Sequence, residues 1–541
     1  MTRRETVLTG LLIFAVALVV RAYFAAQIVF PKPEDTAYYV GVARNLLEGR
    51  GLVSDALWSY GTPPLIFPRP AFEVWMPLPT WLAAIPMALL GATFAAGQVS
   101  SLVLGAIVPV LAWRIAADLA EERGLSAERA RTLALGTGLT CAVYLPLLLH
   151  SALPDSTMPF AVLALAACLL MSCIARDPRR AVWNDPRLVS LGVVLGLTAL
   201  TRNEAAWLAL VWVVIARTAT GTTVPQRVRM IGVAAVVAVA IFLPWALRNW
   251  DAFGSPLPGQ AITNAFSVTG HDIFAWNDPP TLSRYLAVGP GRLLEMRIEG
   301  LWHNLANVLL LPGFPISLVG VAALPWQARG RTLRPLLLLV VITFVVTSLV
   351  FPVATTWGTF LHAAGPVHVL LVISALGALD AGLGRLGSRR GWTRPVAWLG
   401  AVLGIFGSVL FSAVLLPTFG GGSRATAATY EELSARMAAI DRPIDRSMGP
   451  VISNFPIWVA ETQRVSTLAL PDEPADDVLD LARTFGARIL MLTSPESAHW
   501  PAEVEPGARR SDCFRPVDLG SWTGHGDDPL KGTTVYDIVC P

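Results

Sequence analysis

The stretch "FPKPEDTAYYVGVARNLLEGRGL" occupies Phe30–Leu52 and decides how the rest of the chain is interpreted. Two adjacent carboxylates, Glu34 and Asp35, follow the apolar run Thr6–Val29, which is long enough to cross a membrane. This run is too long for a cleavable signal peptide and carries Arg21 too deep within it. We therefore predict a retained membrane helix that is followed by an acidic loop.

The composition indicates a polytopic membrane protein. Of 541 residues, 54% are hydrophobic and 15% are charged, and the mean hydropathy is +0.56. These values exclude a soluble globular protein with an ordinary core. Windows of about 20 residues predict about eleven membrane helices, at 6–29, 95–117, 131–150, 157–175, 187–201, 204–216, 230–247, 304–326, 336–352, 363–383 and 395–417. The apolar segment Leu78–Leu90 is short and contains two prolines, so we expect it to lie in the membrane interface.

Arginines cluster in alternate loops between these predicted spans, which sets the expected topology. Basic residues favour the cytoplasmic side, and the clusters are Arg3–Arg4, Arg123–Arg131, Arg176–Arg180, Arg217–Arg229, Arg329–Arg334 and Arg385–Arg394. We therefore predict a multi-pass protein of the cell (plasma or inner) membrane with a cytoplasmic N-terminus and an extracytoplasmic C-terminus. The inner loops alone account for the net charge of +3, so no nucleic-acid partner is inferred.

The tail from about Gly420 to Pro541 has a different character from the rest. Short apolar runs, "GPVISN", "RVSTLAL" and "ARILMLT", alternate with the helical pattern "DDVLDLARTFG". We predict two domains, a membrane domain at 1–419 and a small soluble extracytoplasmic α/β domain at 420–541. Cys513 and Cys540 lie in this second domain, in an oxidising compartment, so we expect a disulfide between them, with two unpaired thiols as the alternative.

Two acids have a local structural explanation. Asp35 stands before the helical pattern "TAYYVGVARNLL", and Asp155 stands in "LPDSTMPF" before another predicted span. Acids at a helix start are favoured by the free N–H groups and by the helix dipole. Each aspartate is therefore a candidate N-cap, and a capping aspartate can also face a substrate.

Several motifs taken together carry a resemblance to a known family. They are "EDTAYYVGVARNLLEGRGL", "LPDSTMPFAVLALA", "GLTALTRNEAAWLAL" and "LPWALRNWDAFGSP". Over roughly its first 420 residues the chain resembles the GT-C superfamily of polyprenyl-phosphate-sugar-dependent glycosyltransferases, which includes protein O-mannosyltransferases and the lipid A aminoarabinose transferase. The resemblance implies a GT-C fold and inverting transfer of a sugar from a polyprenyl phosphate to a protein, glycan or lipid acceptor outside the membrane.

The resemblance also implies roles for acidic residues. In that family the first outer loop, here about 30–94, supplies an acid that acts on the acceptor, and Asp35 matches it, with Glu34 as a second claimant. A carboxylate in hydrogen-bond reach can take the proton of an acceptor hydroxyl. Asp155 matches the carboxylate of the second outer loop and would orient the acceptor or balance an arginine.

Three basic residues are the candidate ligands of the donor phosphate. Arg202 and Arg248 lie at outer span ends, away from the inner arginine clusters, and guanidinium groups suit phosphate. The alternative is that they only extend toward the membrane surface. His362 lies in an outer loop where many relatives carry a polar or basic residue near the donor, and it is equally compatible with a helix end.

Further candidates line the first outer loop or accompany Arg202. They are Tyr38, Arg69, Glu73 and Glu204. No group of His, Cys, Asp or Glu has metal-ligand spacing, and no Gly-rich phosphate loop is present. Because some GT-C enzymes bind a divalent ion at the outer acids, the resemblance leaves a divalent metal open.

The segment Asn249–His303 is too polar to lie in lipid and too long for a tight turn. Such segments often form lids, so we predict a second outer loop, at about 249–303, that orders over the substrates, with a passive connection as the alternative. Two other functions remain open from sequence. A lipid-linked sugar transporter or flippase would carry charges at mid-membrane depth, and a noncatalytic envelope scaffold would need no paired outer acids.

Overall fold

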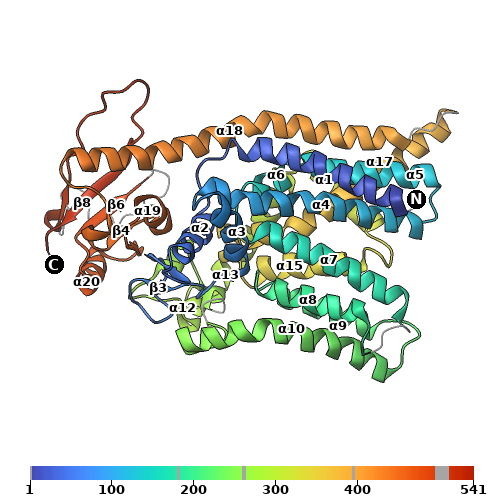
Figure 1. Ribbon diagram of the computed structural model, residues 1–541, viewed down its shortest axis with the longest axis horizontal. Coiled ribbons are helices and arrows are strands. Elements are labelled where there is room, and N and C mark those ends of the chain that lie inside the picture. Colours follow the sequence, from blue (N-terminus) through green and yellow to red (C-terminus); the bar gives the residue numbers. More distant parts are fainter. Residues whose placement is uncertain (1–2, 179–182, 259–262, 393–396, 494–510, 541) are drawn as a thin grey trace.

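The computed structural model describes residues 3–178, 183–258, 263–392, 397–493 and 511–540. Most of the first 440 residues form a bundle of helices (Figure 1). Its helices are α1 (Arg3–Ala25), α2 (Glu34–Leu47), α3 (Leu78–Leu90), α4 (Phe94–Glu122), α5 (Ala127–Val143), α6 (Leu145–Ser151), α7 (Thr157–Arg176), α8 (Pro186–Ala199), α9 (Ala205–Arg217), α10 (Val224–Phe253), α12 (Leu282–Ala287), α13 (Gly289–Trp302), α14 (Ile316–Gln327), α15 (Arg334–Leu349), α16 (Thr359–Ala363), α17 (Gly365–Arg389) and α18 (Ala397–Ala439).

A helix lies at each expected membrane span, which confirms the polytopic fold class. Within the described residues, α1, α4, α7, α10, α17 and α18 are long and apolar enough to cross a membrane, and the bent pair α5–α6 makes a seventh candidate. The shorter apolar helices α8, α9, α14 and α15 coincide with the other four predicted spans. Prolines explain two of the breaks, since Pro146 follows the bend between α5 and α6 and Pro315 directly precedes α14. That all eleven cross the membrane stays a prediction.

The loops that carry the arginine clusters meet one another. Arg123, after α4, donates to the Oε1 of Gln327 at the end of α14 at 3.0 Å. Arg129, at the start of α5, pairs with Asp380 on α17 at 2.6 Å. The N-terminus lies at the end of the bundle opposite the C-terminal sheet (Figure 1).

The tail contains the α/β unit that the sequence predicts. Its strands are β4 (Val451–Ser453), β5 (Thr467–Ala469), β6 (Ile489–Leu492), β7 (Phe514–Pro516) and β8 (Thr534–Ile538), and its helices are α19 (Pro456–Gln463) and α20 (Ala475–Phe485). The three quoted apolar runs form β4, β5 and β6, and the helical pattern forms α20, which ends where Gly486 takes a φ of +70°. A disulfide joins Cys513 to Cys540, so that expectation is confirmed.

The first outer loop takes part in the same sheet. The short strand β2 (Ala56–Leu57) lies parallel to β5 at one edge, and the strand order is β2-β5-β4-β6-β8-β7. The strands β1 (Val53–Ser54) and β3 (Arg69–Pro70) form a separate antiparallel pair. One hydrophobic cluster contains Trp58 from the loop and Leu468 from the tail. The predicted boundary at 420 falls inside α18, which runs from the bundle to the sheet (Figure 1). The two-domain division stays a prediction.

The described parts of the second outer loop, 249–258 and 263–303, contain helices. Helix α10 continues into it to Phe253, where Gly254 has a φ of +70°, and α12 and α13 occupy its second half. Thr281 explains the start of α12, because its side chain accepts a hydrogen bond from the N–H of Arg284 at 3.2 Å. A 3-10 segment, η3 (Gly270–Phe274), precedes these helices.

Candidate active site

A cavity of about 430 Å³ lies between the outer loops and the tail. Its wall is built by the start of α2, the segments before α7 and α9, the region around η3, α16 with the C-terminal end of α15, and the start of α19. Five of the residues singled out in the sequence line it: Glu34, Asp35, Arg202, Glu204 and His362. Most of the remaining wall is apolar and aromatic, so the site combines a few charged groups with a surface suited to a lipid or a sugar ring.

Asp35 points its carboxylate at a histidine rather than capping its helix. The N-cap of α2 is Pro33, so the interpretation of Asp35 as an N-cap is wrong. Its Oδ1 accepts the backbone N–H of Thr36 at 2.9 Å, and its Oδ2 lies 2.9 Å from Nε2 of His362. Asp35 is only 9% exposed, so these contacts replace most of the hydration of its carboxylate.

His362 on α16 is held between two carboxylates. Its Nδ1 lies 2.8 Å from Oγ1 of Thr157 and 3.5 Å from Oδ2 of Asp155. Burial lowers the pKa of His362, but the charges of Asp35 and Asp155 outweigh burial and raise it to about 10. Both ring nitrogens are therefore engaged within the protein. In this arrangement His362 lines the cavity without a free nitrogen for a phosphate, contrary to the expected role of donor ligand.

Asp155 is not the N-cap of α7, which is Ser156, so that interpretation is wrong, and its charged partners are histidines rather than an arginine. Its Oδ1 accepts the N–H of Thr157 at 2.7 Å, at the first residue of α7, and its Oδ2 faces His362 and His150. Asp155 is buried and, among the described residues, is not part of the cavity wall. Burial raises the pKa of Asp155, but the two histidines outweigh it, so the pKa lies well below its usual value and the carboxylate stays charged.

Arg202 lies on the cavity wall and is already paired with Glu204. Its Nε and Nη2 donate to the two carboxylate oxygens of Glu204 at 3.0 and 2.6 Å. Nη1 donates to Ser156 at 2.8 Å, and Nη2 also donates to the carbonyl of Thr359 at 3.1 Å. A guanidinium carries five N–H groups, so one remains for a substrate, and the charge of Arg202 is largely balanced.

Arg248 is not at the cavity. Of the described residues, it is not among those that line the wall, and its Nη1 donates to the carbonyl of Ala71 at 2.8 Å. Its guanidinium lies 4.8 Å from the ring centre of Trp245. Arg248 therefore braces the first outer loop, and the expectation that it contacts the donor phosphate is not carried further.

Arg69, Glu73 and Tyr38 form an interior group of the first outer loop. Arg69 and Glu73 make a fully buried ion pair at 3.0 Å, and Arg69 also donates to loop carbonyls. The hydroxyl of Tyr38 accepts the N–H of Phe72 at 2.7 Å. Within the described part of the chain none of the three lines the cavity, so they shape the loop and do not face a substrate.

Glu34 fastens α2 to the tail. Its Oε1 accepts the backbone N–H of Ile457, at the start of α19, at 3.0 Å. Burial raises the pKa of Glu34 to about 8, against the lowering effect of the N–H groups of Ile457 and Trp458. Close by, the indole of Trp458 donates to the carbonyl of Pro31 at 3.1 Å. The tail therefore positions the turn that carries Asp35.

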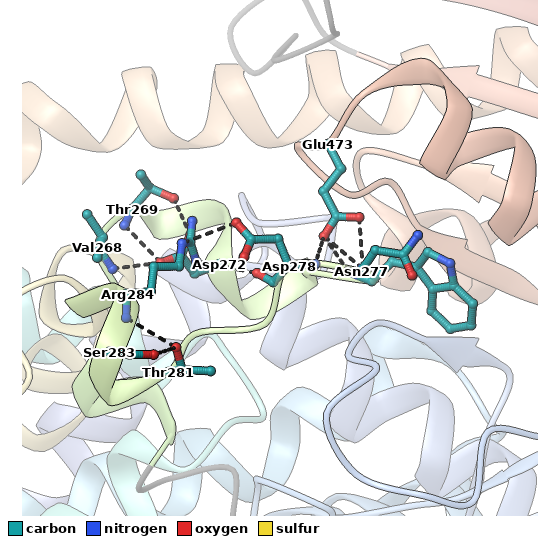
Figure 2. Close-up of polar contacts among 10 residues, drawn as sticks. Val268, Thr269, Asp272, Asn277, Asp278, Thr281, Ser283, Arg284 and Glu473 are labelled. Carbon is teal, nitrogen blue, oxygen red and sulfur yellow. Dashed lines mark hydrogen bonds and ion pairs between the residues drawn. The ribbon is translucent and has the colours of Figure 1, made fainter. Parts of the chain in front are cut away.

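The second outer loop supplies one side of the cavity and is tied to the tail. Ser267, Thr269, Gly270 and Phe274 belong to the wall. Figure 2 shows the carboxylate of Glu473 facing the loop, where it accepts the backbone N–H groups of residues 276 to 278 at 2.8 to 3.0 Å.

Inside the loop, the carboxylate of Asp272 accepts the N–H of Val268 at 2.6 Å and bonds Arg284 at 3.0 Å (Figure 2). This internal bonding keeps the wall segment folded. The described residues 264–274 of the loop therefore form one wall of the cavity, and a lid movement stays a prediction.

Sequence reasoning missed His150, which the fold brings to the site. One ligand atom from each of His150, Asp155 and His362 falls within 4.8 Å of the others. His150 Nδ1 and Asp155 Oδ2 are buried and have no hydrogen-bond partner among the described residues. Buried ligand atoms that face one another without a hydrogen bond fit a cation. The two histidines come from distant helices, so no spacing in the sequence could reveal the cluster.

Several aromatic residues of the wall were also missed. The rings of Trp58 and Trp75 lie 4.4 Å apart between centres at a tilt of 34°, and Trp357 and Trp458 line other sides. Their only signal in the sequence is the high tryptophan content, with 18 residues in the chain. Aromatic faces of this kind are suited to sugar rings or prenyl chains.

Comparisons with known proteins identify the fold. No family model and no curated protein matches the sequence. ArnT from Cupriavidus metallidurans, solved bound to undecaprenyl phosphate, is similar over 98% of this chain and 98% of its own, with a TM-score of 0.56 and 14% identity.

The oligosaccharyltransferase AglB from Archaeoglobus fulgidus, solved with an inhibitory peptide and a dolichol-phosphate, is similar over 90% of this chain and 69% of its own. The TM-score is 0.54 and the identity 14%. A complex of the Archaeoglobus fulgidus oligosaccharyltransferase with Zn and sulfate has a TM-score of 0.52 at 16% identity, over 88% of this chain and 68% of its own. At these identities the likeness establishes the fold alone, and it confirms the fold that the GT-C resemblance implied.

Proposed function

We propose that this protein is an inverting membrane glycosyltransferase that moves a sugar from a polyprenyl phosphate to an acceptor at the outer face of the membrane. The observation that carries the proposal is the meeting of Asp35 and Arg202 in one largely apolar cavity. A lipid phosphate needs an apolar wall for its chain and a cation for its phosphate. The undecaprenyl phosphate bound to ArnT and the dolichol-phosphate bound to AglB agree with such a ligand.

Asp35, Arg202 and His362 have different roles in the proposed reaction. The acceptor hydroxyl approaches Asp35, whose carboxylate takes its proton as the oxygen bonds to the anomeric carbon. The bond from that carbon to the phosphate oxygen breaks, and the electron pair leaves with the phosphate toward Arg202. His362 holds Asp35 in place through the 2.9 Å contact, and Asp155 holds His362.

Inversion follows from the count of carboxylates that can reach the sugar. A retaining route needs a carboxylate nucleophile in addition to an acid/base residue. Glu204 is engaged by Arg202, Glu34 by α19, and Asp155 lies behind His362. Within the described residues this leaves Asp35 alone to act at the reacting centre, and a single displacement inverts the anomeric configuration.

A divalent cation fits the cluster of His150, Asp155 and His362. We propose that the Nδ1 of His150 and the Oδ2 of Asp155, which make no hydrogen bond among the described residues, would be the first ligands, and that His362 would join them on releasing the proton of its Nδ1. Because His150 and Asp155 lie outside the cavity wall, a bound cation would supply positive charge behind His362, on the side of the cavity that carries Asp35. The zinc in the solved oligosaccharyltransferase complex agrees with a metal in this fold.

The topology belongs to the same proposal. We place the N-terminus in the cytoplasm and the cavity, the second outer loop and the domain at 420–541 outside the plasma or inner membrane. The arginine-rich loops that meet near α14 and α17 support this orientation. The tail contributes Ile457 and Trp458 to the wall, so it is suited to help place a protein, glycan or lipid acceptor.

A donor panel tests the function. The purified protein would be incubated with undecaprenyl-phosphate sugars that differ in their hexose or pentose, together with total membrane acceptors. We expect mass spectrometry to detect released undecaprenyl phosphate for at least one sugar, together with a matching mass gain on an acceptor. Movement of intact donor across a vesicle bilayer without release would instead support the transporter.

A further inference from the structure

The chain contains very few lysines, and one of them lines the cavity. Of the 41 basic residues, only Lys32 and Lys531 are lysines. Lys32 belongs to the cavity wall, three residues before Asp35, whereas Lys531 lies on the surface of the tail. The pair offers a functional candidate and a matched control in the same molecule.

The backbone around Lys32 is firmly held. The N–H groups of Val29 and Phe30 both donate to the hydroxyl of Ser423 on α18, at 3.0 and 2.9 Å. The carbonyl of Pro31 accepts the indole N–H of Trp458. Hydrogen bonds to α18 and α19 therefore hold the backbone of residues 29–31 in place. The side chain of Lys32 is exposed, and its ammonium lies 5.6 Å from the centre of the Trp458 ring.

The other cations of the wall already face carboxylates. Arg202 is paired with Glu204, and His362 is paired with Asp35. By contrast, no carboxylate of the described residues lies within ion-pair distance of the Lys32 ammonium. Its acidic neighbour Glu34 is turned to the N–H of Ile457, and the pKa of that carboxyl is raised to about 8 by burial, so it is largely protonated at neutral pH.

We propose that Lys32 binds the phosphate of the polyprenyl phosphate and neutralises the charge that it gains as the sugar leaves. This inference rests on the proposed function and names a further ligand of the same site. The phosphodiester of the donor carries one negative charge, and the departing monoester gains a second. An ammonium on a flexible stem can follow the phosphate during this step, whereas Arg202 has one N–H to offer.

A binding experiment separates Lys32 from the rest of the cavity. Farnesyl phosphate and farnesol, which differ only in the phosphate, would be titrated into the purified full-length protein and its K32M, K32R and K531M variants. We expect the Kd of K32M for farnesyl phosphate to be at least about ten times that of the wild type, because the variant loses a charge-assisted contact. The Kd for farnesol should not change. K32R should retain most of the affinity, and K531M should equal the wild type.

Acetylation of the wild-type protein provides a readout that needs no variant. With a limiting acetylating reagent, mass spectrometry reports the modification of Lys32 and Lys531 separately. We expect farnesyl phosphate to slow the acetylation of Lys32 by about fivefold or more, because at about 80% occupancy only about one fifth of the Lys32 side chains stay free to react. The acetylation rate of Lys531 should not change, and farnesol should not affect either lysine.

The outcomes distinguish the two proposals. If the wild type does not prefer farnesyl phosphate to farnesol, the proposed donor class is wrong. If the wild type shows that preference but K32M keeps it and Lys32 stays reactive, the role of Lys32 is overturned and the proposed function stands. Equal losses in K32M for both lipids would also overturn it, because they would indicate a packing role above Trp458.

Discussion

Asp35 on α2 and His362 on α16 face each other at 2.9 Å across the cavity, although they lie in the first outer loop and near the last helices of the bundle. The contact is completed by Asp155, which lies 3.5 Å from the other ring nitrogen of His362. Two acids and one imidazole therefore form a single charged chain. All three side chains are buried, and Asp35 and His362 line the cavity.

The first prediction concerns the pH dependence of this chain. The pKa of His362 is raised to about 10 from a usual value of about 6.5, so the folded state binds its proton more tightly than the unfolded state. The resulting stability is fully present below pH about 6.5 and is lost as the pH rises through about 10. We expect the Tm difference between wild type and H362Q to be largest at pH 6 and to shrink steadily toward pH 10.

Thermal unfolding in detergent with a chelator present measures this difference. H525Q, in the tail, is the control and should show no such trend. A Tm difference between wild type and H362Q that stays constant or grows between pH 6.5 and 10 would contradict the conclusion that folding raises the pKa of His362.

The second prediction concerns Glu473 and the second outer loop. Its carboxylate accepts N–H groups from three successive residues, 276 to 278 (Figure 2). E473A leaves these amides without an acceptor, so we expect their hydrogen exchange to accelerate about tenfold or more. If closure of the loop over the cavity assists transfer, turnover should fall as well.

D477N is the matched control, because Asp477 accepts only the side-chain amide of Asn277, at 2.8 Å. Its exchange at residues 276 to 278 should resemble that of the wild type. Unchanged exchange in E473A would mean that Glu473 does not hold the loop.

The third prediction concerns the metal. The cluster of His150, Asp155 and His362 has two buried atoms that make no hydrogen bond among the described residues, so we expect about one divalent cation per chain after equilibration with Zn²⁺ or Mn²⁺ and removal of the excess. H150Q should lower this content by about tenfold or more. Elemental analysis measures it, and H525Q serves as the control. Equal metal content in wild type and H150Q would remove His150 from the ligands.

Much of the fold could be predicted from the sequence because its signals are local. The apolar runs predicted a helix at every expected span, and the alternating runs of the tail predicted β4, β5 and β6. Asp35 and Arg202 were candidates because each follows the end of an apolar run, and the fold brings both to the cavity.

The remaining features depend on contacts between distant segments. Strand β2 has two residues and therefore no recognisable alternation, and its partner β5 lies in the tail. The position of Arg248 at the end of a predicted span indicates its depth in the membrane but not the side of α10 on which its side chain lies. In the structure that side faces the carbonyl of Ala71. His150 and Lys32 carry no local signal, because their significance comes from neighbours on other helices.

The central claim is that Asp35 drives displacement of a lipid phosphate by an acceptor. The direct measurement is single-turnover transfer from the best undecaprenyl-phosphate sugar, compared between wild type, D35N and the control D251N, which changes an exposed acid of α10. We predict that D35N lowers the rate by a factor of about 10² to 10⁴ with unchanged donor affinity, that D251N matches the wild type, and that NMR of the wild-type product shows inverted anomeric configuration. A product with the donor's own configuration, or a D35N rate equal to the wild type, would contradict the account.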